Sequence, residues 1–217
     1  MTDKVSVADL RRDYSHATLS EQDVDADPIK QFALWFHQAV ETKVPEPNAM
    51  GLATVGSDGK PSLRIVLLKD FDERGFTFYT NYESRKGEQL LHNPHAALTF
   101  HWHDLERQIR IEGRVERVDG SESDAYYGIR PVKSRIGAHA SAQSRPIENR
   151  EQLERQFHEA EAQFGDNPPR PAHTGFDRGP RAGLRHRGVG PGSRVQRPER
   201  RLYEPDDQRP SSRSDSG

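Results

Sequence analysis

Residues 49–82 read AMGLATVGSDGKPSLRIVLLKDFDERGFTFYTNY, and this stretch decides the fold. It holds three runs rich in β-branched and aromatic residues, separated by the polar segments SDGK (57–60) and DERG (72–75). An Asp-Gly pair between apolar runs is a strong hairpin signal. The stretch therefore predicts three consecutive antiparallel strands.

The sheet is expected to continue after this stretch, because HAALTFHWH (95–103) and RQIRIEGRVERV (107–118) have the same strand-like composition. Helices are predicted at 6–14, 27–43, 84–93, 121–129, 132–139 and 148–164. Asp27 before Pro28, and Ser84 before the third of these helices, are suited to cap helix starts. We expect a mainly β, α+β fold: a six-stranded antiparallel barrel that closes its own edges, with peripheral helices.

The composition changes near residue 170. Only 32% of the 217 residues are hydrophobic and the mean hydropathy is -0.97, so the apolar residues must be concentrated in part of the chain. From Arg170 onward, 11 Arg and six acidic residues give a charge of about +5, whereas the first 169 residues carry about -7. The same tail, 170–217, is rich in Gly and Pro and poor in large apolar residues, so we expect it to be disordered.

Several classes of protein are disfavoured. No apolar run could span a membrane and the N-terminus lacks the apolar stretch of a secretory signal, so a cytoplasmic protein without a membrane partner is expected. The chain has no cysteine, which excludes disulfides and cysteine nucleophiles, so redox chemistry would need a cofactor. His101 and His103 share a strand face but lack an obvious third ligand, so no metal is expected. The tail lacks interleaved aromatic residues, so nucleic acid is not expected either.

Four cations occur at positions suited to anion binding. Strand alternation places Arg64 and Lys69 on opposite faces of RIVLLK (64–69), each at one end of an apolar surface. Arg85 and Lys86 begin a predicted helix, where free backbone N–H groups and the helix dipole favour a phosphate. Taken alone, each pattern also fits ordinary solvated side chains.

A second cluster combines hydroxyls with guanidinium groups. Tyr126, Arg130 and Ser134 recur at four-residue spacing across two short predicted helices, and Arg135 follows. Bidentate Arg contacts and hydroxyl donors can hold a phosphate dianion, although a plain amphipathic helix face has the same pattern. Neutral polar groups suited to the edge of a heteroaromatic ring are Gln108, Gln143 and Ser144, each of which could equally be a surface residue.

Together these motifs resemble the pyridoxamine 5'-phosphate oxidase family in order and spacing, over roughly residues 8–172. The motifs are RRDY (11–14), RIVLLK (64–69), FYTNYESRK (78–86), FHWHDLERQIRIEG (100–113), YYGIRPVKSRIGAHAS (126–141) and AQS (142–144). The resemblance implies a homodimeric FMN-binding split barrel with FMN in a cleft between the subunits. It implies oxidation of pyridoxamine or pyridoxine 5'-phosphate to pyridoxal 5'-phosphate in vitamin B6 metabolism, with oxygen as acceptor. The cofactor would carry the redox step, and no catalytic residue is assigned.

The resemblance also implies site residues. Those for FMN are Arg64, Ile65, Val66, Leu67, Leu68, Tyr79, Thr80, Arg85, Lys86, Gln108, Gln143 and Ser144, with Ile65 to Leu68 and Tyr79 to Thr80 contributing backbone. Those for the substrate are Lys69, Tyr126, Arg130 and Ser134, with Arg11, Arg12, Asp13 and Tyr14 covering it. The expected organisation is a substrate-covering segment (1–26), the FMN-binding split-barrel domain (27–169) and the tail (170–217).

The chain departs from the family pattern after PPRPAH (168–173). The family pattern continues with a Trp-Gly-Gly segment, two strands and an Arg-Leu-His-Asp-Arg motif, and no residue here can be matched to them. The abrupt change indicates a reading-frame shift near codon 173; the alternative is a genuine disordered extension that replaces the terminal strands. Two other functions stay open: a catalytically impaired flavin- or vitamer-binding protein, and a split-barrel flavin oxidoreductase with another substrate.

Overall fold

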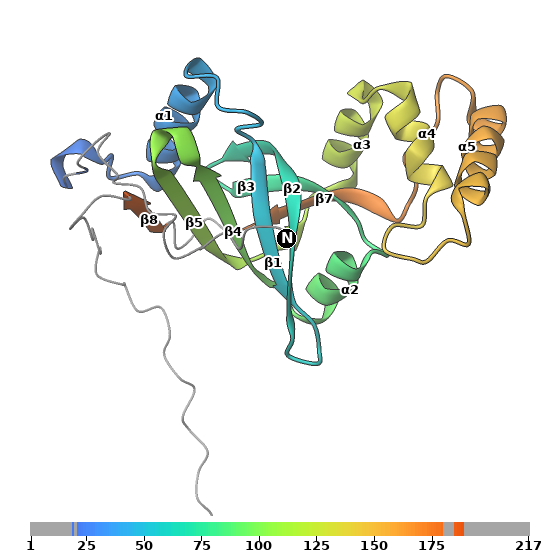
Figure 1. The fold of residues 1–217 in the computed structure, drawn as a ribbon, viewed down its shortest axis with the longest axis horizontal. Helices are drawn as coiled ribbons and strands as arrows, with labels where there is room; N and C mark the ends of the chain where they lie inside the picture. Colours follow the sequence, from blue (N-terminus) through green and yellow to red (C-terminus); the bar gives the residue numbers. More distant parts are fainter. Residues whose placement is uncertain (1–18, 20, 180–184, 189–217) are drawn as a thin grey trace, which may run out of the picture.

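The computed structural model describes residue 19, residues 21–179 and the backbone of residues 185–188. In this part of the chain, eight antiparallel strands form one sheet in the order β6-β7-β3-β2-β1-β4-β5-β8, and the sheet curls into a half-barrel (Figure 1). The strands are β1 (Ala49–Val55), β2 (Pro61–Asp72), β3 (Gly75–Asn81), β4 (His95–Trp102), β5 (Arg107–Arg114), β6 (Glu116–Arg117), β7 (Thr174–Gly179) and β8 (Arg185–Gly188). The predicted mainly β fold with peripheral helices is confirmed.

The main core lies between the sheet and helix α1 (Pro28–Glu41). Asp27 caps this helix as predicted, because its side chain accepts a hydrogen bond from the Ile29 backbone at 2.9 Å. Phe32 on α1 is fully buried, and its ring centroid lies 4.8 Å from those of Phe71 and Phe76. These edge-on aromatic contacts fix α1 against β2 and β3.

Strand β2 is interrupted by a β-bulge at Lys69. Leu68 pairs with Phe78 and Asp70 with Thr77, so Lys69 is an extra residue on β2 with no partner in β3. Such a bulge shifts the alternation of side chains by one position. The regular alternation of side chains that was predicted for residues 64–69 therefore ends at Leu68.

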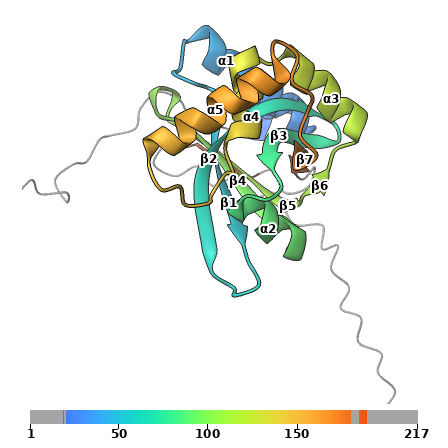
Figure 2. The ribbon, with the colours of Figure 1, turned by 90° about the vertical axis from the view of Figure 1, so that its right-hand side faces the viewer.

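Three helices form a lobe at one side of the sheet (Figures 1 and 2). They are α3 (Gly120–Ile129), α4 (Val132–Ala140) and α5 (Arg150–Phe164), and a small second core built around Ile136 and Ala160 joins α4 to α5. Helix α2 (Arg85–His92) lies separately at one end of the sheet, and the short 3-10 helices η2 (Glu21–Asp23) and η3 (His103–Leu105) complete the described elements. Within the described residues, no helix has the length and apolar character needed to cross a membrane.

The prediction that the whole tail lacks regular structure is wrong for residues 174–179, and for the backbone at 185–188. Strand β7 pairs with β3 over six residue pairs and with β6 on its other side, and β8 pairs with β5. The described sheet thus has two more strands than the six predicted. The rest of the predicted tail and the predicted helix at 6–14 lie outside the described residues.

Candidate active site

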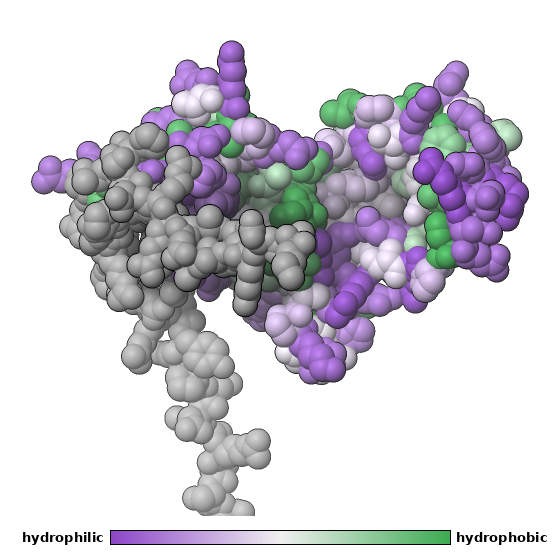
Figure 3. Space-filling model, in the orientation of Figure 1, coloured by the Kyte–Doolittle hydropathy of each residue, from purple (hydrophilic) through white to green (hydrophobic). Residues whose placement is uncertain are grey.

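A cavity of about 640 Å³ opens between strand β2, the start of α2 and the helical lobe. On the face seen in Figure 3, apolar surface gathers at the centre, where the sheet meets the lobe. The lining residues are Ser62, Leu63, Arg64, Ile65, Val66, Leu67, Lys69, Tyr79, Arg85, Lys86, Tyr126, Arg130, Gln143 and Ser144. Residues predicted separately for the cofactor and for the substrate therefore line one cavity.

The Arg64 guanidinium is held by neutral acceptors from three elements. Its terminal nitrogens donate to Thr54 Oγ1 at 2.7 Å and to Ser62 Oγ at 2.6 Å, with a weaker contact of 3.4 Å to Gln89 Oε1. Burial, followed by the nearby Arg85 charge, lowers the Arg64 pKa. The group is fixed in place while its positive charge remains without a carboxylate partner among the described ion pairs.

Lys86 is buried beside Arg64. Its ammonium donates to Ser84 Oγ at 3.1 Å and to Gln143 Oε1 at 2.5 Å. Burial, and then repulsion by Arg64, lower the pKa of Lys86 to about 8, although the Asp177 carboxylate acts in the opposite direction. Ser84 also caps α2 as predicted, so the same turn that starts the helix orients this lysine. An anion that enters here would meet a poorly solvated cation, which strengthens the attraction.

A second group of cations lies on the side of the lobe. The Arg130 guanidinium carbon lies 4.5 Å from the centroid of the Tyr79 ring, and Lys69 Nζ lies 5.9 Å from that of Tyr126. One terminal nitrogen of Arg130 donates weakly to the Ser134 carbonyl at 3.3 Å. The other, Nη1, is buried and has no hydrogen-bond partner within the described part of the chain. A buried donor without a partner is costly, so this site is built to receive an acceptor.

The lining of the cavity carries five cations, Arg64, Lys69, Arg85, Lys86 and Arg130, and no Asp or Glu. Neighbouring like charges without counter-charges raise the free energy of the empty protein, and anions relieve that cost. Lys69 and Arg64 line this cavity together with Ile65, Val66 and Leu67, so residues from both faces of this part of β2 border it, although the sequence placed the two cations on opposite faces. The geometry can hold an elongated ligand that bears an anionic group at each end, or two separate anions.

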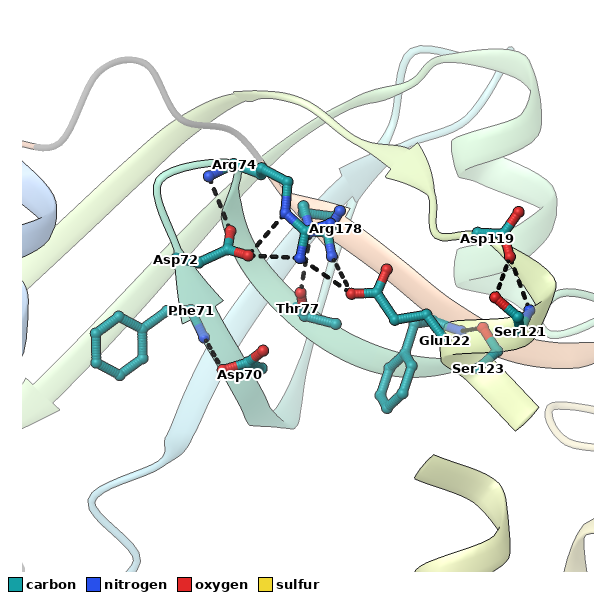
Figure 4. Close-up of polar contacts among 11 residues, drawn as sticks. Asp70, Phe71, Asp72, Arg74, Thr77, Asp119, Ser121, Glu122, Ser123 and Arg178 are labelled. Atoms are coloured by element: carbon teal, nitrogen blue, oxygen red, sulfur yellow. Dashed lines mark hydrogen bonds and ion pairs between the residues drawn. The ribbon is translucent and has the colours of Figure 1, made fainter. Parts of the chain in front are cut away.

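Strand β7 and the β2–β3 turn hold helix α3 (Figure 4). Helix α3 carries Tyr126, which lines the cavity. Glu122 accepts hydrogen bonds from Arg74 at 3.1 Å and from Arg178 at 2.8 Å. Buried Ser123 accepts one from the Phe176 backbone N–H at 3.1 Å. The lobe therefore contacts the sheet through strand residues that lie in the predicted tail.

Some predicted site residues do not line the cavity. Leu68 and Thr80 are buried in the core behind it, and Gln108 lies on β5, opposite His101 of β4. The Ser134 side chain is exposed, and only its carbonyl contacts Arg130. Arg11, Arg12, Asp13 and Tyr14 lie outside the described residues. Arg135, which was grouped with Arg130 in the sequence, instead donates to Asn167 and Asp166 after α5.

Two kinds of residue were not predicted from the sequence: one that lines the cavity, and one that fixes a lining residue from behind. Ser62 lines the cavity, and its position two residues before Arg64 on one strand could have indicated this. Gln89 on α2 accepts from Thr54 at 2.7 Å and from Ser62 at 2.6 Å, and so fixes the surroundings of Arg64. Its role depends on how α2 packs against β1, which no local pattern reveals. In the described part of the chain, no group of three or more His, Asp or Glu residues could hold a metal ion.

Comparisons with known proteins agree with this arrangement. Residues 36–164 match the family described as pyridoxamine 5'-phosphate oxidase. A protein of Janthinobacterium sp. strain Marseille, named pyridoxine/pyridoxamine 5'-phosphate oxidase, is 60% identical over 171 residues, which are 79% of this chain and 81% of that protein. The protein of the same name from Bordetella avium is 63% identical with the same two coverages.

Solved structures show related folds. PhzG from Burkholderia lata, in complex with tetrahydrophenazine-1-carboxylic acid, is 30% identical with a TM-score of 0.75, over 80% of this chain and 87% of that one. A pyridoxamine 5'-phosphate oxidase-related, FMN-binding protein from Nostoc punctiforme is 17% identical with a TM-score of 0.56, over 72% and 82% of the two chains, and shares the split-barrel fold. With a family match over more than half of its length and relatives at 60% identity or above, the chain belongs to the pyridoxamine 5'-phosphate oxidase family.

Proposed function

We propose that this protein binds FMN in the cavity and oxidises pyridoxamine or pyridoxine 5'-phosphate to pyridoxal 5'-phosphate, with oxygen as the electron acceptor. The observation that carries the proposal is the set of five cations that lines one cavity, with no carboxylate among the described lining residues. FMN and the substrate each bear a phosphate, so both need such cations. The 60% identical relatives named pyridoxine/pyridoxamine 5'-phosphate oxidase support the same activity.

Arg64, Arg85 and Lys86 form the first group of cations, and they fit the FMN phosphate. Arg64 and Lys86 are fixed by neutral hydrogen-bond partners, and Arg85 is exposed at the start of α2, where helix N–H groups add donors. Ile65, Val66 and Leu67 offer an apolar wall for a flat ring system. Gln143 and Ser144 add polar groups at the cavity edge, so the donor set suits a flavin mononucleotide.

The second group fits the substrate phosphate. Arg130 offers the unpartnered Nη1 donor, Lys69 adds a second charge, and the Tyr126 hydroxyl can donate. Because hydrogen bonds between charged groups are the strongest that this cavity offers, they would orient the substrate from its phosphate end. We also propose that residues 11–14 cover the substrate.

When bound, FMN supplies the hydride acceptor and passes the electrons to oxygen. The protein's own part is binding and orientation: both phosphates are held, and the apolar strand β2 lines the space between the two cation groups. Among the described residues, the cavity lining includes no carboxylate or imidazole, which are the commonest general bases. The lining residues therefore contribute to the reaction by holding the cofactor and the substrate in position.

We propose that the active unit is a homodimer. The exposed fractions of Leu63 and Ile65 are 69% and 70%, and both side chains adjoin the cavity on strand β2. A second copy that covers this apolar strand would also close the cavity. Gln108 lies outside the cavity of its own chain, and in such a dimer it would line the cavity of the second copy.

A second candidate is oxidation of a non-phosphorylated aromatic substrate, which is favoured by the similarity to PhzG. The higher identity to the phosphate oxidases, and the unpartnered donor of Arg130, favour the phosphorylated vitamers. The third candidate, flavin binding without turnover, follows from the departure of the sequence after His173.

The test is to load the purified chain with FMN and to follow pyridoxal phosphate formation and oxygen consumption. Pyridoxamine phosphate, pyridoxine phosphate and a tricyclic aromatic carboxylate would be compared as substrates. Turnover of the first two supports the proposal, whereas turnover of the carboxylate alone supports the second candidate. Stoichiometric FMN without turnover of any substrate would identify a binding protein.

A further inference from the structure

We propose that the ring of Tyr79 is a positioning residue for Arg130, and that it thereby sets the preference for phosphorylated over non-phosphorylated substrates. This rests on the proposed function. The family resemblance implies a role only for the backbone of Tyr79, as a flavin contact. Its side chain, however, lies in the cavity with the Arg130 guanidinium 4.5 Å from its ring centroid.

Arg130 is otherwise weakly held. It follows the last residue of α3 and precedes Pro131, so its backbone is extended and no helix turn supports its side chain. Its only side-chain hydrogen bond to the described residues is the 3.3 Å contact to the Ser134 carbonyl, and Nη1 is buried without a partner among them. A long arginine side chain loses much conformational freedom when it is fixed. The guanidinium lies closer to the Tyr79 ring, at 4.5 Å, than to the Tyr127 ring, at 5.5 Å, so the contact with Tyr79 is the main interaction that can fix it.

The Tyr79 ring is itself fixed from three sides. Its hydroxyl donates to Thr174 Oγ1 at 2.7 Å, and that hydroxyl in turn donates to the Pro171 carbonyl at 3.1 Å. The Phe176 ring meets it edge-on at 5.5 Å, and Tyr126 lies 6.1 Å away. Tyr79 also lies on β3, which pairs with β2 on one side and β7 on the other. A rigid aromatic face of this kind is a good support for a guanidinium.

The consequence for specificity follows from charge. A phosphate dianion gains from a guanidinium that is already oriented, because the cost of fixing Arg130 has been met before binding. A substrate without the phosphate makes no use of Arg130 and gains nothing from its orientation. Tyr79 should therefore affect the ratio of kcat/KM values for pyridoxamine phosphate and pyridoxamine.

The experiment compares Tyr79→Phe, which keeps the ring, with Tyr79→Leu, which removes it. We expect Tyr79→Leu to lower the ratio of kcat/KM for pyridoxamine phosphate to that for pyridoxamine about tenfold, and Tyr79→Phe to change it less than about threefold. Rates are expressed per bound FMN. The affinity for pyridoxal phosphate, measured by titration, should fall in parallel with the ratio.

Two further measurements separate positioning from a general structural effect. In an Arg130→Ala background, Tyr79→Leu should have little additional effect on pyridoxal phosphate affinity, because the residue it positions is gone. In addition, a Tyr79→Phe series with increasingly fluorinated rings keeps the shape but weakens the attraction to a cation, so affinity should fall stepwise.

An equal effect of Tyr79→Leu with and without Arg130, or a flat fluorination series, would overturn the proposal. If Tyr79→Leu does not fold, the fluorinated series still decides. If the parent protein binds pyridoxal phosphate but turns over no substrate, the proposed function fails, while the affinity measurements still test Tyr79.

Discussion

Lys86 Nζ donates a 2.5 Å hydrogen bond to Oε1 of Gln143, a residue 57 positions later in the chain. This contact connects the start of α2 to the segment after α4, and it closes one end of the cavity. It also orients Gln143, because the amide oxygen faces the lysine and the NH₂ group stays available as a donor.

Replacing Arg85 and Lys86 together with Ala should weaken FMN binding at least tenfold, about 1.4 kcal/mol. The reason is that both residues belong to the cation group proposed for the phosphate. Flavin fluorescence titration measures the affinity. Lys60→Ala is the matched control, because this exposed lysine lies on the β1–β2 turn outside the cavity. Equal FMN affinity in the double variant and the control would show that the phosphate binds elsewhere.

FMN binding by the apoprotein should weaken as the pH rises through about 8. The pKa of Lys86 is lowered to about 8, chiefly by burial, so this side chain is a cation below that pH and neutral above it. A phosphate monoester stays a dianion above its second pKa of about 6, so the FMN phosphate does not titrate between pH 7 and 10. We expect roughly a tenfold loss across this range. Lys86→Arg should abolish the pH dependence, because arginine stays charged. A parent protein with constant affinity from pH 7 to 10 would contradict this account.

Arg130→Ala and Lys69→Ala should each raise the KM for pyridoxamine phosphate by about tenfold or more, while FMN remains bound. Both cations lie in the second group, away from the residues proposed for FMN. Steady-state kinetics, with FMN content measured on the same samples, gives the result. Lys133→Ala is the control, since this exposed lysine lies on α4 outside the cavity lining. Normal kinetics in both variants would place the substrate phosphate at another site.

Asp177→Asn should stabilise the protein at pH 8 but not at pH 4. Burial raises the pKa of Asp177 to about 6, against the effects of nearby Arg117 and Lys86. A carboxyl whose folded pKa exceeds its unfolded value costs stability as the pH rises from about 4 to 6, and the full cost persists above that. We expect a gain of roughly 2 kcal/mol at pH 8. Denaturant unfolding at the two pH values measures it, and an equal effect at both would rule out titration as the cause.

Ser123→Ala should destabilise the protein more than Glu122→Gln, although Glu122 has two arginine partners. The ion pairs of Glu122 are partly exposed, and such pairs contribute about 0–1 kcal/mol. Loss of the Ser123 hydroxyl would instead leave the buried Phe176 N–H without an acceptor, at a cost of about 1–3 kcal/mol. Thermal unfolding of the two variants gives the comparison. The reverse order would mean that the Glu122 network (Figure 4) is the stronger attachment of α3.

Much of the fold could be predicted because its signals are local. Asp27 and Ser84 cap helices at the expected positions, and the Asp58-Gly59 turn joins β1 to β2. Strand β7 was not predicted, since Gly175, Asp177 and Gly179 have low strand propensity. Its pairing with strands on both sides outweighs that propensity.

For the site, the types of the functional residues were easier to predict than the directions in which their side chains point. The cations were identified, but the sequence could not show that Lys69 and Arg64 line one cavity, because strand alternation places them on opposite faces of RIVLLK. The approach of Gln143 to Lys86, and of Tyr79 to Arg130, likewise depends on packing between distant elements.

The bulge at Lys69 means that this part of the protein should tolerate changes of side chain better than changes of length. Deleting Lys69, the residue between Leu68 and Asp70, would restore regular pairing with β3, and it would remove a cation from the cavity. In an alignment of relatives, a gap at this point should therefore be rarer than a substitution. In a library of random single-codon deletions, those at 68–70 should lose activity on the phosphorylated vitamers while the protein still folds.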